Sequence, residues 1–289
     1  MCVLMVGEQI KVRSFPEKNY RAIYFRGKTL RQTYRPKTPI SELDYPEFYD
    51  VKITNHCNGK CPWCYQDSLP EEGHFDDILN KINDFFGCLD DNQKPFQVAI
   101  GGGEPTGHPD FIKALKLFHD LGITPNYTTN GMFCSEVSGR QRIIEATRKY
   151  CGGVAISCHP HLRQYWEMAA SLFLLNGIKL NFHLIISDGN SVNAFLKIYE
   201  KYKDDIDYFV LLPHTAQGRA NHKRIAAGKL FKELKRLDSS KIAFGANFYD
   251  DLKERGGELD ISLYEPEIMS KYLDMKNMKV YKSSFHLEG

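Results

Sequence analysis

The chain has 289 residues, of which 42% are hydrophobic and 26% are charged. This composition excludes collagen-like, coiled-coil and intrinsically disordered chains and provides enough apolar material for a full core. The formal net charge of +2 gives no strong field toward nucleic acid or anionic lipid. The most apolar stretch, 165–186, is too polar to cross a bilayer, and the first residues lack the pattern of a signal peptide. We therefore expect a cytoplasmic protein that does not associate with a membrane.

The first 48 residues differ in texture from the rest of the chain. They are rich in Arg, Lys, Tyr and Pro, and apolar and polar positions alternate around Tyr20 to Leu30. This alternation predicts a hairpin or an extended arm over residues 1–48, joined by a proline-marked connection to the next segment.

From Tyr49 onward, short β-like runs alternate with amphipathic helical patterns. The strand candidates are Asp50–Thr54, Phe96–Ile100, Thr124–Thr128, Gly153–Ser157, Leu180–Ile186 and Tyr208–Leu212. Helical spacing follows over 75–85, 111–118, 192–199 behind a predicted Ser191 N-cap, and 230–237. Six βα units in a row imply right-handed crossovers and a parallel sheet over residues 49–220, with the functional site in the loops after the strands.

The fifth strand candidate distinguishes between an open sheet and a barrel. In Leu180–Leu184, the polar Asn181 and His183 share one face and the apolar residues share the other. A strand covered on both faces is apolar throughout, so this alternation favours an α/β partial barrel with a polar lumen. Residues 221–289 are expected to form a helix and a small extension that closes one side of the barrel. Its strand candidates are 241–244, 260–264 and 278–281.

A cluster of cysteines follows the first strand of this series directly. Cys57, Cys61 and Cys64 are spaced four and three residues apart on a loop that contains a glycine. Three thiolates at this spacing can hold a cubic iron–sulfur cluster and leave its fourth iron open for a ligand. Two other interpretations remain open at this point: a zinc site that recruits a fourth ligand such as His56, and a chance coincidence of thiols.

The next strand ends in a second motif, Gly101-Gly102-Gly103-Glu104-Pro105. Glycines at a strand end allow a ligand to approach the backbone closely, and Glu104 adds an acceptor for an ammonium group. The alternative is a glycine-rich turn before a helix. The motif is not a dinucleotide fingerprint, because the third glycine spacing and the acidic residue are missing.

Together these motifs resemble the radical S-adenosylmethionine superfamily. The resemblance rests on Cys57-x-x-x-Cys61-x-x-Cys64 with Trp63 before the last cysteine, and on Gly102-Gly103-Glu104-Pro105. Thr129-Asn130-Gly131 and Ser157, at later strand ends, also resemble family elements. It covers about residues 49–220 and implies a partial (β/α)6 TIM-type barrel.

The resemblance implies two cofactors, a [4Fe–4S] cluster held by the three cysteines and S-adenosylmethionine bound to its open iron. The residues it implies for S-adenosylmethionine are Trp63, Gly102, Gly103, Glu104, Pro105, Asn130, Ser157, Asn181 and Leu212. One electron, from a donor such as flavodoxin or ferredoxin, would yield a 5′-deoxyadenosyl radical that removes a hydrogen atom from substrate. Cys158 and His183 are the catalytic candidates, with a buried thiol and a structural histidine as their alternatives.

The substrate is less well marked. Gly218-Arg219-Ala220 resembles the branch of the family that modifies peptides, although the chain has no cysteine after Cys158 to build that branch's auxiliary cluster. A peptide or protein side chain is the leading expectation. Alternatives are a nucleotide or nucleic acid, to which the basic residues of 223–236 point, activation of a glycyl-radical enzyme, and a zinc-stabilised binding module.

Overall fold

The computed structural model describes residues 10–289 except for 26, 221–227, 249–251, 253–265 and 286–289. Its main feature is a nine-stranded sheet in the order β10-β9-β8-β7-β6-β5-β4-β11-β12. The six central strands are parallel neighbours and follow chain order: β4 (Phe48–Thr54), β5 (Gln97–Gly102), β6 (Thr124–Thr129), β7 (Gly153–Ser157), β8 (Leu180–Ile186) and β9 (Tyr208–Pro213). All six predicted strands are therefore confirmed to within about two residues at each end.

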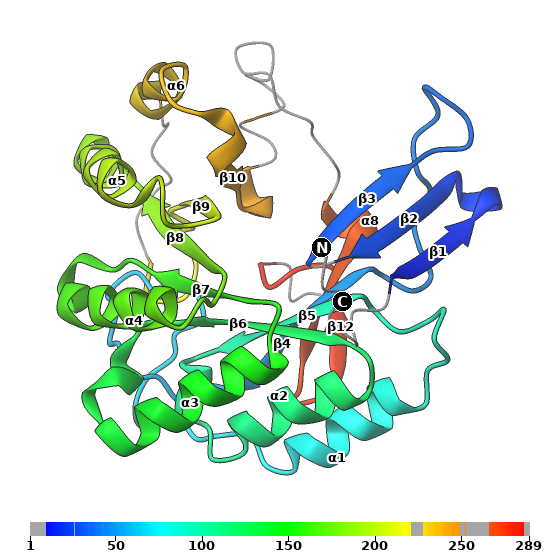
Figure 1. The fold of residues 1–289 in the computed structure, drawn as a ribbon, viewed down its shortest axis with the longest axis horizontal. Helices are drawn as coiled ribbons and strands as arrows, with labels where there is room; N and C mark the ends of the chain where they lie inside the picture. The colour runs from blue at the N-terminus through cyan, green and yellow to red at the C-terminus, as the bar shows by residue number, and fades with distance from the viewer. Residues whose placement is uncertain (1–9, 26, 221–227, 249–251, 253–265, 286–289) are drawn as a thin grey trace, which may run out of the picture.

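Helices cover the outer face of this curved sheet (Figure 1). The helices that follow the six strands are α1 (Ile78–Ile82), α2 (Phe111–Asp120), α3 (Val137–Tyr150), α4 (Arg163–Leu175), α5 (Gly189–Tyr202) and α6 (Gly228–Leu234). Their apolar faces and the outward side chains of the strands form one large core, whose fully buried members include Phe118, Trp166, Phe182 and Phe209. The result is the predicted α/β partial barrel of six βα units.

Two helix starts differ from the sequence prediction. The first helix begins at Ile78 and not at Phe75, because Asp77 has a φ of +59°, outside the helical region. The N-cap of α5 is Asp188, whose side chain accepts hydrogen bonds from the backbone N–H groups of Asn190 and Ser191. The predicted N-cap, Ser191, is instead the third helical residue of a capping box, so that prediction was wrong.

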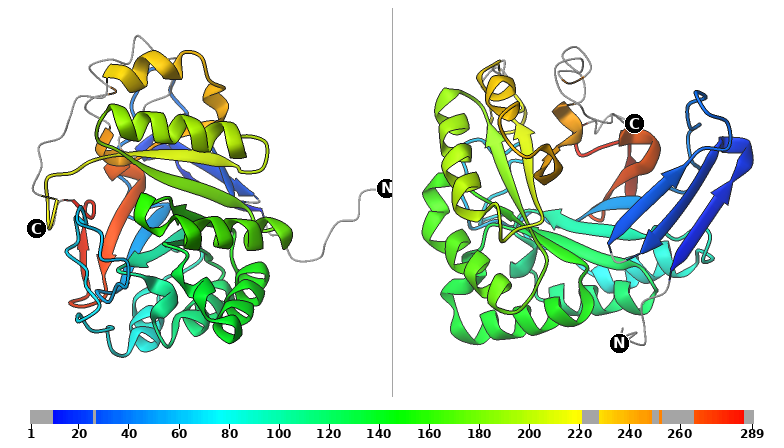
Figure 2. Two further views of the ribbon diagram at one scale, coloured as in Figure 1. Left: turned by 90° about the vertical axis from the view of Figure 1, so that its left-hand side faces the viewer. Right: turned by 45° about the horizontal axis from the view of Figure 1, so that its top comes forward.

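The two ends of the chain add strands in different ways. Residues 11–32 form a separate antiparallel sheet of β1 (Lys11–Phe15), β2 (Tyr20–Phe25) and β3 (Lys28–Gln32), with its own small core. This three-stranded sheet stands where the sequence predicted a hairpin or an extended arm, and it lies on the opposite side of the molecule from α4 and α5 (Figures 1 and 2).

The C-terminal extension flanks both edges of the barrel sheet. Strand β10 (Ile242–Phe244) pairs with β9, while β11 (Ser270–Asp274) follows the short helix α8 (Pro266–Met269) and pairs with β4. Strand β12 (Lys279–Tyr281) then pairs with β11 as the antiparallel edge. The predicted strands at 241–244 and 278–281 are confirmed, whereas the one at 260–264 lies outside the described residues.

Candidate active site

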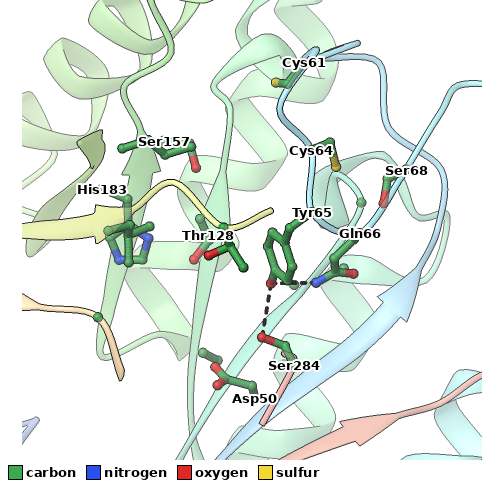
Figure 3. Close-up of a pocket in the computed structure, with 18 of the residues that line it drawn as sticks. Asp50, Cys61, Cys64, Tyr65, Gln66, Ser68, Thr128, Ser157, His183 and Ser284 are labelled. Carbon is green, nitrogen blue, oxygen red and sulfur yellow. Dashed lines mark hydrogen bonds between the residues drawn. The ribbon is translucent and has the colours of Figure 1, made fainter. Parts of the chain in front are cut away.

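The curved sheet encloses a cavity of about 630 Å³. Its walls come from the cysteine loop after β4, from the strands β4 to β11, and from Ser284 and Phe285 near the C-terminus. Figure 3 shows Cys61 and Cys64 at one end, Asp50 at the other, and Tyr65 between them, with Ser157 and His183 on a side wall. The cavity thus joins the cysteine loop to the lumen of the barrel.

All three cysteines of the motif line this cavity. Burial raises the pKa of the Cys57 thiol to about 11 and that of Cys61 to about 12, so without a metal these two groups stay protonated at neutral pH. No group of three or more His, Cys, Asp or Glu side chains in the described part of the chain converges on a single ion. A cubic cluster takes each thiolate on a different iron, and the three thiols open onto one cavity, so the donor set fits such a cluster.

A histidine that sequence reasoning missed packs against the loop. His161 Nε2 lies 3.0 Å from the carbonyl oxygen of Gly59 and 3.7 Å from Cys61 Sγ. Its ring also makes an edge contact with Trp63 at a centroid distance of 5.4 Å. His161 stands in the short turn between β7 and α4, and nothing in its sequence context marks it as a neighbour of the cysteines.

Arg219 binds the cysteine loop from the segment after β9. Its Nε and one terminal nitrogen donate to the carbonyl oxygen of Cys61 at 3.2 and 3.1 Å. The guanidinium also donates to the Ser68 carbonyl and to Asp67 Oδ1, both at 2.8 Å, and the Arg219 backbone N–H donates to the Cys64 carbonyl at 3.0 Å. The Gly-Arg-Ala element therefore fixes the path of the loop that carries the three thiols.

The glycine beside this arginine is required sterically. A Cβ at Gly218 would lie 2.5 Å from the Tyr65 carbonyl oxygen and 2.6 Å from that of Cys64, and its φ is +61°. Only glycine allows this close approach at a positive φ without strain.

The glycine motif at the end of β5 packs closely against the backbone at the start of the same loop. A Cβ at Gly103 would lie 2.0 Å from the His56 carbonyl oxygen, and one at Gly102 would lie 2.3 Å from that of Thr54. The backbone N–H groups of Gly103 and Glu104 donate to the Thr54 and His56 carbonyls respectively, both at 2.8 Å. These glycines thus allow the close backbone packing that positions the segment leading into Cys57, in addition to any contact that they make with a ligand.

Glu104 ties two strand ends together. Its carboxylate accepts hydrogen bonds from Thr106 Oγ1 at 2.6 Å, Thr129 Oγ1 at 2.8 Å and the Asn130 backbone N–H at 2.7 Å, with a weaker one from the Thr106 N–H. The side chain is buried, and burial raises its pKa while these donors oppose the rise. Thr129 and Asn130, from the Thr-Asn-Gly element, are held in place by this carboxylate.

Three buried polar atoms on the cavity wall have no hydrogen-bond partner among the described residues. They are Trp63 Nε1, Gln66 Oε1 and Ser68 Oγ, all on the cysteine loop. Buried polar groups of a folded protein are nearly always satisfied, so unpaired ones facing a cavity indicate a bound group. Together with three thiols, this arrangement fits a cluster and a polar organic cofactor at that end.

Most of the residues expected from the sequence do line the cavity. Besides the cysteines, these are Trp63, Gly102, Gly103, Glu104, Asn130, Ser157, His183 and Leu212. Three others do not. Pro105 is buried outside the cavity wall, and Asn181 lies earlier on β8, also outside the wall. Cys158 is packed in the main core, with its thiol directed at the Ile156 carbonyl oxygen and its pKa raised by burial.

The far end of the cavity contains titratable groups that sequence reasoning did not single out. Asp50 projects from β4 into the cavity, where its side chain stays open to solvent. Desolvation by the surrounding walls raises the pKa of its carboxyl group to about 7. Burial lowers the pKa of His183 and of His159 to about 4, so both imidazoles are neutral near pH 7. Tyr65 crosses the space between, accepting a hydrogen bond from Gln66 Nε2 at 2.8 Å and donating to Ser284 Oγ at 3.3 Å (Figure 3).

Comparison with known proteins agrees with this geometry. Residues 51–159 match the family model described as the radical SAM superfamily. A candidate glycyl-radical enzyme activating enzyme of Methanocaldococcus jannaschii is 32% identical over 94 residues, which is 32% of this chain and 35% of that protein. The chain thus matches about a third of the length of this curated relative.

Solved structures share the fold at low sequence identity. Streptococcus suis SuiB bound to S-adenosylmethionine superposes with a TM-score of 0.64 at 17% identity, over 84% of this chain and 61% of SuiB. The protein anSMEcpe, bound to S-adenosylmethionine and a peptide, gives a TM-score of 0.56 at 16% identity, over 84% of this chain and 76% of that one.

Residues 51–159 form the domain that defines a superfamily of enzymes, and the partial barrel is the fold of its solved members. Over these residues the chain therefore carries a radical SAM domain, and it is similar in sequence to a relative of that kind. The cofactors of the family are a [4Fe–4S] cluster and S-adenosylmethionine, as the resemblance implied. No helix in the part of the chain that the structure describes has the length and apolar character to cross a bilayer.

Proposed function

We propose that this protein is a radical S-adenosylmethionine enzyme that removes a hydrogen atom from a peptide or protein side chain. One observation carries the proposal: three thiols and three unpartnered buried polar atoms of the same loop open onto one cavity at the carboxyl ends of the barrel strands. Ligand sites of parallel α/β folds lie at this end.

The cofactors, when bound, supply a one-electron cleavage of the sulfonium carbon–sulfur bond, which leaves methionine and a 5′-deoxyadenosyl radical that takes a hydrogen atom from substrate. Cys57, Cys61 and Cys64 would hold the cluster as thiolates and release their protons on binding it. Trp63 Nε1 and Ser68 Oγ, which have no partner among the described residues, would donate to S-adenosylmethionine, and Leu212 would provide an apolar wall.

Other residues would act by position. Glu104 holds the Thr129 hydroxyl and the Asn130 N–H in place, so the strand ends around the cofactor are fixed before it binds. Ser157 and His183 line the cavity from a side wall. A neutral His183 is available for hydrogen bonding to a substrate without adding charge.

A polypeptide substrate is supported by what similar folds bind. SuiB has been solved with its precursor peptide, and anSMEcpe with peptides. The Gly218-Arg219-Ala220 resemblance points the same way, although here this element contacts the cysteine loop. An electron donor such as flavodoxin or ferredoxin and a cytoplasmic location, which keeps thiols reduced, complete the proposal.

A second candidate is activation of a glycyl-radical enzyme. It is favoured by the 32% identity to the Methanocaldococcus protein over 94 residues. Its substrate would also be a polypeptide, but the hydrogen would leave a backbone glycine and the product would be a stable radical. Electron paramagnetic resonance of a reacted partner separates the two functions.

The test of the proposed function is anaerobic reconstitution with iron and sulfide, followed by S-adenosylmethionine and dithionite. We expect about four irons per chain and reductant-dependent 5′-deoxyadenosine. The control is the triple variant with Cys57, Cys61 and Cys64 replaced by Ala, which is expected to give neither. Stoichiometric zinc without 5′-deoxyadenosine would contradict the proposal and favour a metal-stabilised binding module.

A further inference from the structure

Asp50 occupies the end of the cavity opposite the cysteines. It lies in the middle of β4, with Ala99 of β5 beside it on one side and Tyr272 of β11 on the other. It lies four positions before Thr54, the last residue of the strand, a distance of roughly 13 Å at about 3.3 Å per residue. Figure 3 shows it beyond Tyr65 as seen from Cys64. Asp50 is therefore too far from the cysteine loop to belong to the cluster site.

The carboxylate of Asp50 has no partner of its own. It makes no hydrogen bond or ion pair with any residue that the structure describes. The nearest cation on its strand, Lys52, is 3.9 Å from Asp274. The other cavity carboxylate, Glu104, is satisfied by its four hydrogen bonds.

The groups that face Asp50 are uncharged near neutral pH. Tyr65 lies toward the cysteine loop and Tyr272 lies on the neighbouring strand β11, and burial raises the pKa of both phenols. His183, on β8 across the lumen, is neutral because burial lowers its pKa to about 4. No lysine or arginine is among the described residues that line the cavity.

The Asp50 side chain is open to the solvent of the cavity, and it faces no counter-charge among the described residues. The walls around it replace part of its water, which disfavours the ionised form. Such a group in a cavity is a candidate functional residue. The chemistry that removes this cost is a cation entering the cavity with its charge against the carboxylate.

We propose that Asp50 binds a cationic side chain of the substrate, the ammonium of a lysine or the guanidinium of an arginine, and so anchors the substrate at the end of the cavity opposite the cysteines. The inference rests on the proposed function in that it assigns this cavity to a polypeptide substrate. Charge recognition at one end and hydrogen abstraction at the other would let the ion pair set which carbon of the peptide faces the cofactor.

The probes are the N-acetyl, N-methylamide derivatives of lysine, arginine and norleucine, titrated calorimetrically into the reconstituted full chain with S-adenosylmethionine. Norleucine matches the lysine chain without its charge. We expect wild type to bind one or both cationic probes about tenfold or more tighter than norleucine. Asp50→Asn is expected to abolish this preference, and Asp50→Glu to retain part of it. The lysine and arginine arms distinguish the two cations.

The pH dependence separates binding from a merely structural role. Affinity for the cationic probe is expected to rise between pH 6 and 8 as the carboxyl group ionises, and to be flat in Asp50→Asn. If Asp50→Asn does not fold, the proposal is tested by the pH dependence of probe binding to wild type and by the cation preference of Asp50→Glu. A wild-type protein without preference for cations, or a preference that survives in Asp50→Asn, would overturn the proposal.

The proposed function is judged separately, by 5′-deoxyadenosine released from wild type without any probe. If the protein prefers cationic probes but releases no 5′-deoxyadenosine, the proposed Asp50 site is supported and the proposed enzymatic function is contradicted. If the protein releases 5′-deoxyadenosine but shows no preference for cationic probes, the proposed function is supported and the proposed Asp50 site is contradicted.

Discussion

At the cysteine end of the cavity, hydrogen bonds join one short loop to three distant segments, whereas the opposite end takes single side chains from separate strands. Arg219, His161 and the Gly103–Glu104 backbone all contact the loop or the strand that leads into it. Asp50, His183 and Tyr272 come from β4, β8 and β11. The first end is fixed before any ligand binds, while the second retains an unpaired charge. This difference suits a site in which the cysteine end holds the cofactors in a constant position and the opposite end acquires its counter-charge only when substrate binds.

The largest effect is expected from the thiols. Cys61→Ala removes one of three cluster ligands, and the two remaining thiolates are not expected to retain the cluster. Iron content and the visible absorbance of the reconstituted protein measure the loss. Cys134→Ala is the matched control, since Cys134 is also buried but packs in the core. Equal iron in both variants would mean that the cysteine end is not a cluster site.

A methyl group at Gly218 tests how tightly the loop is held. Gly218→Ala is expected to cost about 3 kcal/mol of unfolding free energy, from strain at its positive φ and from overlap with two carbonyl oxygens. Gly177 is a suitable control because its φ is +66° and a Cβ there meets nothing within 4 Å. Gly177→Ala is expected to cost only about 1 kcal/mol. Urea unfolding of both variants measures the difference in unfolding free energy. Equal losses would show that the cysteine loop moves away from a methyl group at residue 218 at little cost.

Loss of the Arg219 guanidinium removes the donor to the Ser68 carbonyl and leaves the Cys61 carbonyl with only the Cys64 N–H as donor. We expect Arg219→Ala to lower the unfolding free energy by about 2 kcal/mol and to speed cluster loss. Arg219→Lys is expected to recover only part, because an ammonium does not reproduce the planar fork. The control is Arg236→Ala, whose side chain is 69% exposed and pairs with Glu233, with an expected effect under about 0.5 kcal/mol. An unchanged rate of cluster loss would show that Arg219 does not position the loop.

The smallest effect is at the opposite end and has the opposite sign. Because the Asp50 carboxyl has a raised pKa of about 7 when folded, its ionised form costs stability that appears as pH rises from about 4 to 7. Asp50→Asn is expected to stabilise the protein by about 1 kcal/mol at pH 8, after allowance for water in the cavity, and not at pH 4. Thermal unfolding at both pH values measures this. Asp91→Asn, at a fully exposed position, is the control, and a destabilised Asp50→Asn would show that this end of the cavity needs the carboxylate.

The sequence placed the cysteine end of the cavity correctly because its three thiols lie close together in the chain. Cys57, Cys61 and Cys64 and the glycine motif lie at the ends of β4 and β5, which the alternating pattern located correctly. The spacing could not reveal His161 or the contacts of Arg219, since these depend on how the segments after β7 and β9 fold back onto the loop. Asp50 was hidden for another reason: on a strand with alternating polarity, a single polar residue reads as solvent-facing, and only barrel closure makes it a lumen residue. Cys158 shows the converse, because a residue next to a strand end can turn into the core.

The pairing of β11 with β4 has a consequence for how the chain folds. These strands lie more than 200 residues apart in sequence, so β4 remains an open edge until the segment ending at Asp274 has docked. Contacts over such separations form late, and uncovered strand edges are where folding intermediates associate. A chain cut after residue 220 would lose β10 as well as β11, exposing both edges of the central sheet at once. Such a truncated chain is expected to aggregate, although it would contain every cysteine of the cluster motif.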